Sequence, residues 1–166
     1  MKVIFLDVDG VLNDTTDYTT KWEITTAHMN VLKSIIEQTG ARIIVSSAWR
    51  YAFGSRRKLE RALEAAGLVK DGETPKLGFS LNPPMEKKEE EILAWLEAHP
   101  DVDTYAILDD HEDFCKQLAA HQVKTVLGEG LLEKHIAETI ALIGVLEDEP
   151  EEEPEEEPSE PEQQEE

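Results

Sequence analysis

The sequence of 166 residues contains a single cysteine, Cys115, and has no long apolar run. One cysteine excludes an intramolecular disulfide and agrees with a reducing compartment. No apolar run approaches the roughly 20 residues that span a membrane. The amino-terminal apolar stretch is interrupted too early for a secretory signal, because Asp7 and Asp9 follow it directly. These absences favour a cytoplasmic protein that does not associate with a membrane.

Basic residues are absent from residues 147–166, which carry 13 of the 37 acidic residues. Self-repelling glutamates, broken by prolines and without apolar residues to bury, predict a disordered tail. A solvated appendage is the simplest interpretation. A solubility aid, a mimic of nucleic acid and a docking segment for a basic protein partner stay open. We expect one folded domain over residues 1–146, with a net charge of about −8, followed by this acidic tail.

In the rest of the chain, short apolar runs alternate with segments whose apolar residues have helical spacing, and 40% of all residues are apolar. Short apolar runs predict strands at residues 2–6, 41–45, 104–108 and 122–127. Helical spacing predicts helices at residues 24–38, 55–66 and 88–98, and near 113–120 and 131–146. Residues 67–86 are rich in glycine and proline, which predicts a loop or a small hairpin. Repeated βα units indicate an α/β, Rossmann-like fold, a parallel sheet with helices on both faces.

Polar side chains follow the first three of the expected strands. These residues are Asp7 and Asp9, then Ser46 and Ser47, then Asp109 and Asp110. The carboxyl ends of parallel strands meet at one edge, which is where open α/β sheets bind ligands. We therefore expect one site there. The segment around Asp9 could instead be a simple turn, because aspartate accepts local backbone hydrogen bonds and glycine supplies positive φ.

The order of these motifs resembles the haloacid dehalogenase (HAD) phosphohydrolase superfamily. DVDGVL at residues 7–12 matches the family pattern D-x-D-G-[TV]-[LI], and the serines, a lysine pair and LDD at 108–110 follow in family order. The resemblance covers residues 1–127. It implies a HAD-like fold and a Mg²⁺-dependent phosphatase that works through an aspartyl-phosphate. Residues 12–24 and 51–86 are too short for a large lid, so we expect a minimal cap or none.

The resemblance also implies catalytic roles for Asp7 as nucleophile and Asp9 as general acid and base. Their spacing suits this pairing, because residues i and i+2 at a strand end project to the same side. Lys88 would neutralise negative charge in the transition state. We prefer it to Lys87 because an apolar helix residue, Ile92, lies four positions on.

A phosphoryl oxygen and a metal ion complete the site that the resemblance implies. Ser46 would donate a hydrogen bond to the phosphoryl group, with Ser47 as the alternative if the strand ends one residue later. Mg²⁺ prefers oxygen ligands, and its expected ligands are Asp7, the Asp9 backbone carbonyl, and Asp109 or Asp110. Asp109 is the preferred direct ligand of the last two, and Asp113 is a candidate helper.

The run SSAWR at residues 46–50 resembles HAD domains associated with nucleic-acid (RNA) end repair. In that case Arg50 would hold a substrate phosphate through paired N–H donors, and Trp49 would stack on a base. Gly10 and Ser47 complete the expected substrate-binding set. The alternative is that Trp49 packs in the core and Arg50 pairs with a nearby acid.

A basic cluster follows this run, at Arg56, Arg57, Lys58 and Arg61. It either rims the site or forms a solvated helix face that is balanced by Glu60 and Glu64. We expect hydrolysis of a polynucleotide end, particularly a 3'-phosphate. A phosphatase for a nucleotide or sugar phosphate stays open, as does a non-catalytic HAD-fold protein whose tail binds a basic partner.

Overall fold

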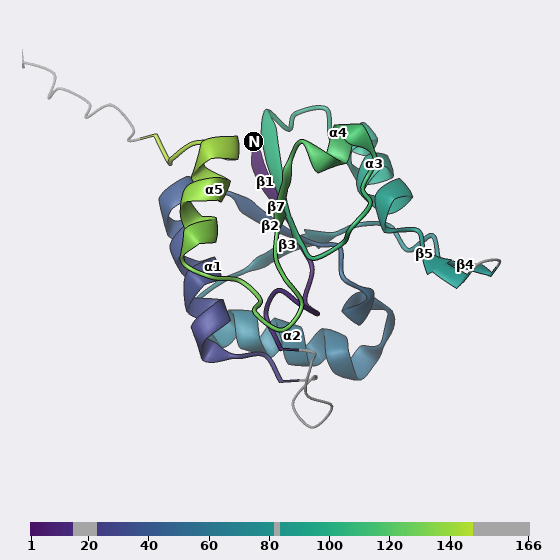
Figure 1. Ribbon diagram of the computed structural model, residues 1–166, viewed down its shortest axis with the longest axis horizontal. Helices are drawn as coiled ribbons and strands as arrows, with labels where there is room; N and C mark the ends of the chain where they lie inside the picture. Colours follow the sequence, from purple (N-terminus) through teal and green to yellow (C-terminus); the bar gives the residue numbers. More distant parts are fainter. Residues whose placement is uncertain (15–22, 82–83, 148–166) are drawn as a thin grey trace, which may run out of the picture.

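A computed structural model describes residues 1–14, 23–81 and 84–147, with a five-stranded sheet at its centre (Figure 1). The strand order is β3-β2-β1-β6-β7, and every neighbouring pair is parallel. The strands are β1 (Lys2–Leu6), β2 (Arg42–Val45), β3 (Lys70–Glu73), β6 (Thr104–Asp109) and β7 (Gln122–Lys124). The predicted Rossmann-like α/β fold is confirmed.

The central strand β1 is apolar along most of its length because both of its faces are covered. Phe5 pairs with Ile44 of β2 and with Ile107 of β6, and all three side chains are buried. Strands that are buried on both faces show continuous apolar runs instead of alternation. This explains why Asp7, the first acidic residue after β1, marks the carboxyl edge of the sheet.

Helices cover both faces of the sheet and bury two separate apolar clusters. One cluster joins the sheet to α1 (Thr26–Thr39), α2 (Phe53–Ala65) and α5 (Lys134–Ile143). The other joins it to α3 (Lys88–Ala98) and the short α4 (Lys116–Ala119). Thr25 caps the start of α1 with its hydroxyl, and Gly40 ends the helix in the left-handed conformation, so both helix ends follow from the sequence.

The segment between β2 and α3 contains more regular structure than its composition predicts. A 3₁₀ helix, η1 (Ala48–Tyr51), leads into α2, and β3 then joins the edge of the main sheet. The predicted small hairpin is present as β4 (Phe79–Leu81) and β5 (Pro84–Glu86), which project from the body of the molecule in Figure 1. Among the described residues this segment contains no separate cap domain.

The prediction of a loop or a small hairpin over residues 67–86 missed β3, because β3 is a polar edge strand. Its sequence KDGE has no apolar side chain, and the strand interrupts its register with β2 between Ile43 and Ile44. At that point the Asp71 carboxylate accepts the Ile43 backbone N–H at 2.8 Å. β7 is shorter than predicted, and α4 forms only part of the helix expected near residues 113–120.

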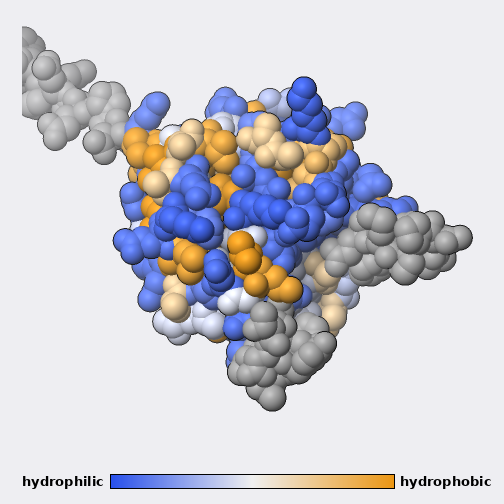
Figure 2. Space-filling model, in the orientation of Figure 1, coloured by the Kyte–Doolittle hydropathy of each residue, from blue (hydrophilic) through white to orange (hydrophobic). Residues whose placement is uncertain are grey.

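The surface drawn in Figure 2 is mostly hydrophilic, and its apolar residues form separate patches. In the described ranges, no helix is long and apolar enough to cross a membrane. Apart from Glu147, the predicted acidic tail lies outside the described residues, as does much of the connection between β1 and α1.

Candidate active site

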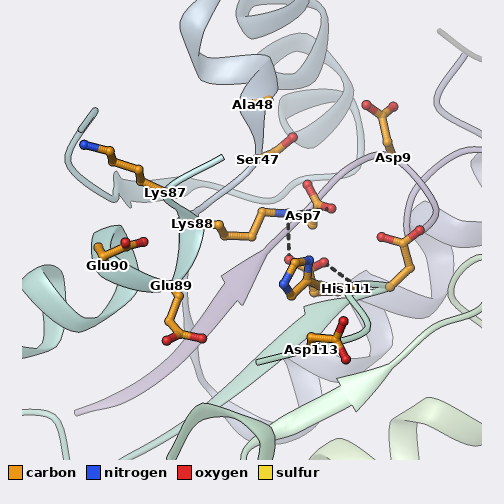
Figure 3. Close-up of a pocket in the computed structure, with 12 residues that line it drawn as sticks. Asp7, Asp9, Ser47, Ala48, Lys87, Lys88, Glu89, Glu90, His111 and Asp113 are labelled. Atoms are coloured by element: carbon orange, nitrogen blue, oxygen red, sulfur yellow. Dashed lines mark hydrogen bonds and ion pairs between the residues drawn. The ribbon is translucent and has the colours of Figure 1, made fainter. Parts of the chain in front are cut away.

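A pocket of about 690 Å³ opens at the carboxyl edge of the sheet, where β1, β2 and β6 end (Figure 3). It collects most of the residues that the sequence places in one site. The lining residues include Asp7, Asp9, Ser47, Lys87, Lys88, Asp109, Asp110 and Asp113, together with His111.

Lys88 is the cation at the centre of this pocket. Its Nζ lies 3.0 Å from Asp7 Oδ2 and 2.9 Å from Asp109 Oδ2. Lys88 is the first residue of α3 and is only 8% exposed. The start of this helix therefore places the ammonium group inside the pocket, against the acids that follow β1 and β6. Lys87 also lines the pocket, but Figure 3 shows it directed away from Asp7. The structure therefore brings Lys88, and not Lys87, into contact with the acids.

Carboxylate oxygens of Asp7, Asp109 and Asp110 lie within 4.8 Å of one another. Asp109 is fully buried, and its Oδ1 accepts the His111 backbone N–H at 2.9 Å. Burial, then repulsion from Asp7, raises the pKa of Asp109 to about 7, although Lys88 opposes the shift. Burial and Asp7 also raise the pKa of Asp110.

These three acids fit a divalent cation. Among the described residues Lys88 contacts two of the three carboxylates, and burial together with the charge of Asp7 raises the pKa of Asp109. Carboxylates are the hard oxygen ligands that Mg²⁺ prefers. Asp113 is exposed on the pocket rim and does not belong to the cluster.

Asp9 lines the pocket but lies outside the carboxylate cluster. Its Oδ1 accepts hydrogen bonds from Asn13 Nδ2 at 2.8 Å and from Trp49 Nε1 at 3.1 Å. Figure 3 shows its carboxylate directed away from Asp7. The two aspartates therefore come from one turn, but in this conformation they do not face a common point.

Gly10 shapes the turn that carries Asp9 and is not among the residues lining the pocket. Its φ is +74°, its N–H donates to Asn13 Oδ1 at 3.1 Å, and its carbonyl accepts from Thr125 Oγ1 at 2.7 Å. A Cβ at this position would lie 2.4 Å from Asp110 Oδ2. In this conformation Gly10 therefore serves turn formation and the close approach of Asp110.

The two serines after β2 have different positions. Ser47 lines the pocket, and its Oγ accepts the Trp49 backbone N–H at 3.2 Å. Ser46 is not among the lining residues, and its buried Oγ has no hydrogen-bond partner in the described part of the chain. β2 ends at Val45, and the Ser46 N–H still donates to the Leu6 carbonyl. The serine that reaches the pocket is therefore Ser47, one residue after the preferred Ser46.

Trp49 and Arg50 are buried, in the arrangement of the alternative prediction, in which Trp49 packs in the core and Arg50 pairs with an acid. Trp49 is 3% exposed and belongs to the apolar cluster beneath the loop. Arg50 is 2% exposed and forms an ion pair with Glu91 of α3. Its guanidinium also donates to the carbonyls of Ser46 at 2.8 Å and Ser47 at 2.6 Å. Its donors are thus committed within the protein, and none is directed at the pocket.

Glu91 and Asn13 are supporting residues that were not predicted from the sequence. Glu91 accepts from Tyr51 and from the Leu77 backbone N–H, so it connects α3 to both η1 and the segment before β4. The helical spacing of α3 could have indicated that Glu91 is buried, because Glu91 lies on the same helix face as Lys88 and Trp95. Asn13 is fully buried and follows the DVDGVL motif directly, which was the corresponding signal for it.

Comparison with known families places this geometry in context. Residues 3–136, from β1 into α5, match the model of a family described as the HAD domain in Swiss Army Knife RNA repair proteins. No curated protein and no solved structure matches the chain.

Proposed function

Because the chain belongs to the family of HAD domains in Swiss Army Knife RNA repair proteins, we propose that it removes a terminal phosphate from RNA, in particular a 3'-phosphate. The observation that supports phosphate chemistry most directly is the buried contact of Lys88 with both Asp7 and Asp109 at the floor of an open pocket. Carboxylates with a positioned cation suit a phosphoryl group, whose transfer depends on charge stabilisation and positioning.

In the first step the Asp7 carboxylate attacks phosphorus, and an acyl-phosphate bond forms as the bond from phosphorus to the RNA oxygen breaks. The departing oxygen takes a proton from Asp9. Lys88 stabilises the negative charge on the phosphoryl oxygens, and the Ser47 hydroxyl on the pocket wall donates to one of them.

In the second step a water molecule attacks the phosphorus of the aspartyl-phosphate. Asp9, now a carboxylate, removes the proton from that water. The bond between phosphorus and the Asp7 oxygen breaks, inorganic phosphate leaves, and the Asp7 carboxylate is restored. The substrate and one water are thus converted to an RNA hydroxyl and phosphate, with Asp9 returned to its starting proton state.

Asp9 must turn toward Asp7 for both proton transfers. In the structure it is held by Asn13 and Trp49 through a single oxygen, Oδ1. Rotation about its side-chain bonds would exchange these two contacts for the substrate oxygen. Binding of substrate supplies that new partner, because the leaving oxygen then lies beside Asp7.

Asp7, Asp109 and Asp110 would hold Mg²⁺, together with the backbone carbonyl of Asp9. When bound, the ion would offset the charge of the carboxylates and of the substrate phosphate. Two unit charges 4 Å apart interact by about 4 kcal/mol at an effective dielectric of 20, so this compensation is substantial.

The substrate class is tested by phosphate release from three compounds at equal concentration: a 3'-phosphorylated RNA oligonucleotide, a nucleoside monophosphate and a sugar phosphate. We expect the oligonucleotide to have the highest kcat/KM, and we expect chelation of divalent cations to stop release. Preference for either small ester would contradict the RNA-end proposal and support a metabolite phosphatase. Release from none of them, with or without Mg²⁺, would support a binding role.

A further inference from the structure

The solvent-facing side of α2 carries a stripe formed by Phe53, Arg57 and Arg61. These residues are four positions apart, which places them on one side of a helix. Phe53 is 75% exposed, and the Arg57 guanidinium lies 5.6 Å from the centre of its ring. Together with Gly54 and Lys58, the stripe lines a shallow hollow of about 570 Å³. An exposed aromatic ring and two exposed guanidinium groups thus share one open surface.

The basic residues next to this stripe form ion pairs with acidic residues of the described chain, whereas the arginines of the stripe do not. Arg56 pairs with Glu60 and Glu73, and Lys58 pairs with Glu23. Within the described residues no ion pair involves Arg57 or Arg61. Glu60 and Glu64 line a neighbouring hollow together with the stripe, and Glu60 is itself paired with Lys70 at 2.5 Å. The hollow under the stripe is thus lined by basic residues and by no acidic residue of the described chain, on a domain whose net charge is about −8.

We propose that this stripe binds the RNA strand whose 3' end enters the pocket. The identity of the ligand rests on the proposed function, whereas the surface is identified by its own chemistry. Phe53 offers a flat face for a base, and base–aromatic stacking tolerates any sequence. Arg57 and Arg61 lie one helical turn apart and supply donors for successive backbone phosphates. An acidic protein segment would use the arginines but would have no need of the exposed ring.

The stripe is close enough to the pocket to share one strand with it. Ser47 and Ala48 form the pocket wall above Asp7 and Lys88 in Figure 3, and η1 runs from Ala48 directly to α2. Five Cα steps separate Ala48 from Phe53, which limits their separation to about 19 Å. Ser55 Oγ donates to the Trp49 carbonyl at 2.8 Å and fixes the start of α2 to η1. A strand of a few nucleotides covers this distance.

The test measures binding separately from catalysis. The probe is a fluorescent single-stranded RNA of about ten nucleotides with a 3'-hydroxyl, so that no phosphate can be released, and affinity is measured by anisotropy over a range of salt concentrations. The variants are Phe53→Ala, Phe53→Trp and the double variant Arg57→Ala with Arg61→Ala. The matched control is Arg42→Ala, which removes an exposed arginine from the start of β2. This residue lies at the amino ends of the parallel strands, whereas the pocket lies at their carboxyl ends.

We expect the double arginine variant to bind RNA about tenfold more weakly and to reduce the slope of log affinity against log salt by about 1.4, or 0.7 for each lost phosphate contact. Phe53→Ala should weaken binding at least about fivefold, and Phe53→Trp should retain the wild-type affinity. Hydrolysis of an aryl phosphate, which is too small to reach α2, should be unchanged in all of them.

Wild-type affinity in both Phe53→Ala and the double arginine variant would overturn this inference, as would an equal loss in Arg42→Ala. Either result could occur in a protein that still hydrolyses a 3'-phosphorylated RNA, and the proposed function would then stand. Stripe-dependent RNA binding by a protein that releases no phosphate from any substrate would support the inference and contradict the proposed function.

Discussion

Two pairs of one aromatic residue and one arginine occur between residues 49 and 57, and they lie in opposite environments. Trp49 and Arg50 are buried beneath the pocket, where the arginine pairs with Glu91 and binds backbone carbonyls. Phe53 and Arg57 lie on the surface of α2 with their flat groups in contact with solvent and with each other. The same residue types thus organise a loop in one place and form an exposed surface in the other.

The difference arises from partners that are distant in sequence. Arg50 is drawn inward because α3 presents Glu91, 41 residues away, together with carbonyls that require donors. A buried ion pair is strongly destabilised when one member is removed, since the other charge is left uncompensated. An exposed arginine has no such dependence, because water solvates it equally well in the folded and unfolded chain. Stability measurements should therefore separate the two pairs.

The largest expected difference concerns the arginines. Arg50→Met should lower the free energy of unfolding by about 3–5 kcal/mol, because the buried Glu91 loses its charge partner and several carbonyls lose a donor. Arg57→Met, the same change on the surface, should lower it by less than about 0.5 kcal/mol. Urea unfolding of both variants provides the measurement. A loss below 1 kcal/mol for Arg50→Met would show that the buried network does not hold this loop.

The acids of the pocket should make the stability of the metal-free protein depend on pH. Asp109 has a pKa of about 7 in the folded protein and an ordinary value of 3.8. Between these values the folded state holds the proton that the unfolded state has released. Stability should therefore fall as pH rises from 4 to 7, by at most about 1.4 kcal/mol per pH unit for this group.

Asp109→Asn should flatten this dependence, because the amide does not titrate. The measurement is thermal or urea unfolding at several pH values in the presence of a chelator. An equally steep fall in Asp109→Asn would assign the pH dependence to other groups. The stripe on α2 contains only arginine and phenylalanine, so Arg57→Met should retain the wild-type pH profile.

The two aromatic residues should differ by a smaller amount. Trp49→Phe keeps most of the apolar contacts but removes the hydrogen bond from Nε1 to Asp9, and we expect a loss of about 1–2 kcal/mol. Phe53→Leu should change stability by less than about 0.5 kcal/mol. Calorimetric unfolding of the two variants tests this, and a larger loss in Phe53→Leu than in Trp49→Phe would reverse the comparison.

The smallest expected effect concerns the acidic tail. Deletion of residues 147–166 removes 13 acidic residues but should leave the hydrolysis of an aryl phosphate unchanged if the tail is a solvated appendage. The measurement is kcat/KM for the full chain and for the shortened chain at the same ionic strength. A several-fold loss would show that the tail contributes to the site.

The sequence predicted the elements whose patterns are local and apolar. β1 and β2 were identified by their buried runs, and α3 was predicted with the bounds that it has in the structure. β3 could not be found in this way, because an edge strand without apolar residues is held by its backbone and by Asp71. Its existence depends on the edge of β2, which no local pattern describes.

The positions of the acids in the site were predictable, whereas the orientation of several neighbouring side chains was not. Asp7, Asp109 and Asp110 meet because parallel strands end at one edge, so strand assignment alone brings them together. The choice between Ser46 and Ser47 depends on a shift of one residue at the end of β2. The burial of Arg50 depends on Glu91, a contact between distant segments that residue type does not reveal.

In the proposed reaction Asp7 performs nucleophilic catalysis on a phosphate ester. The most direct measurement is Mg²⁺-dependent phosphate release from a 3'-phosphorylated RNA and an aryl phosphate by the wild-type protein and by Asp7→Asn, with unfolding of both proteins as the control. We expect release by the wild type, and a loss of at least about 10³-fold in the variant without a comparable loss of stability. Equal rates in the two proteins would exclude Asp7 as the nucleophile.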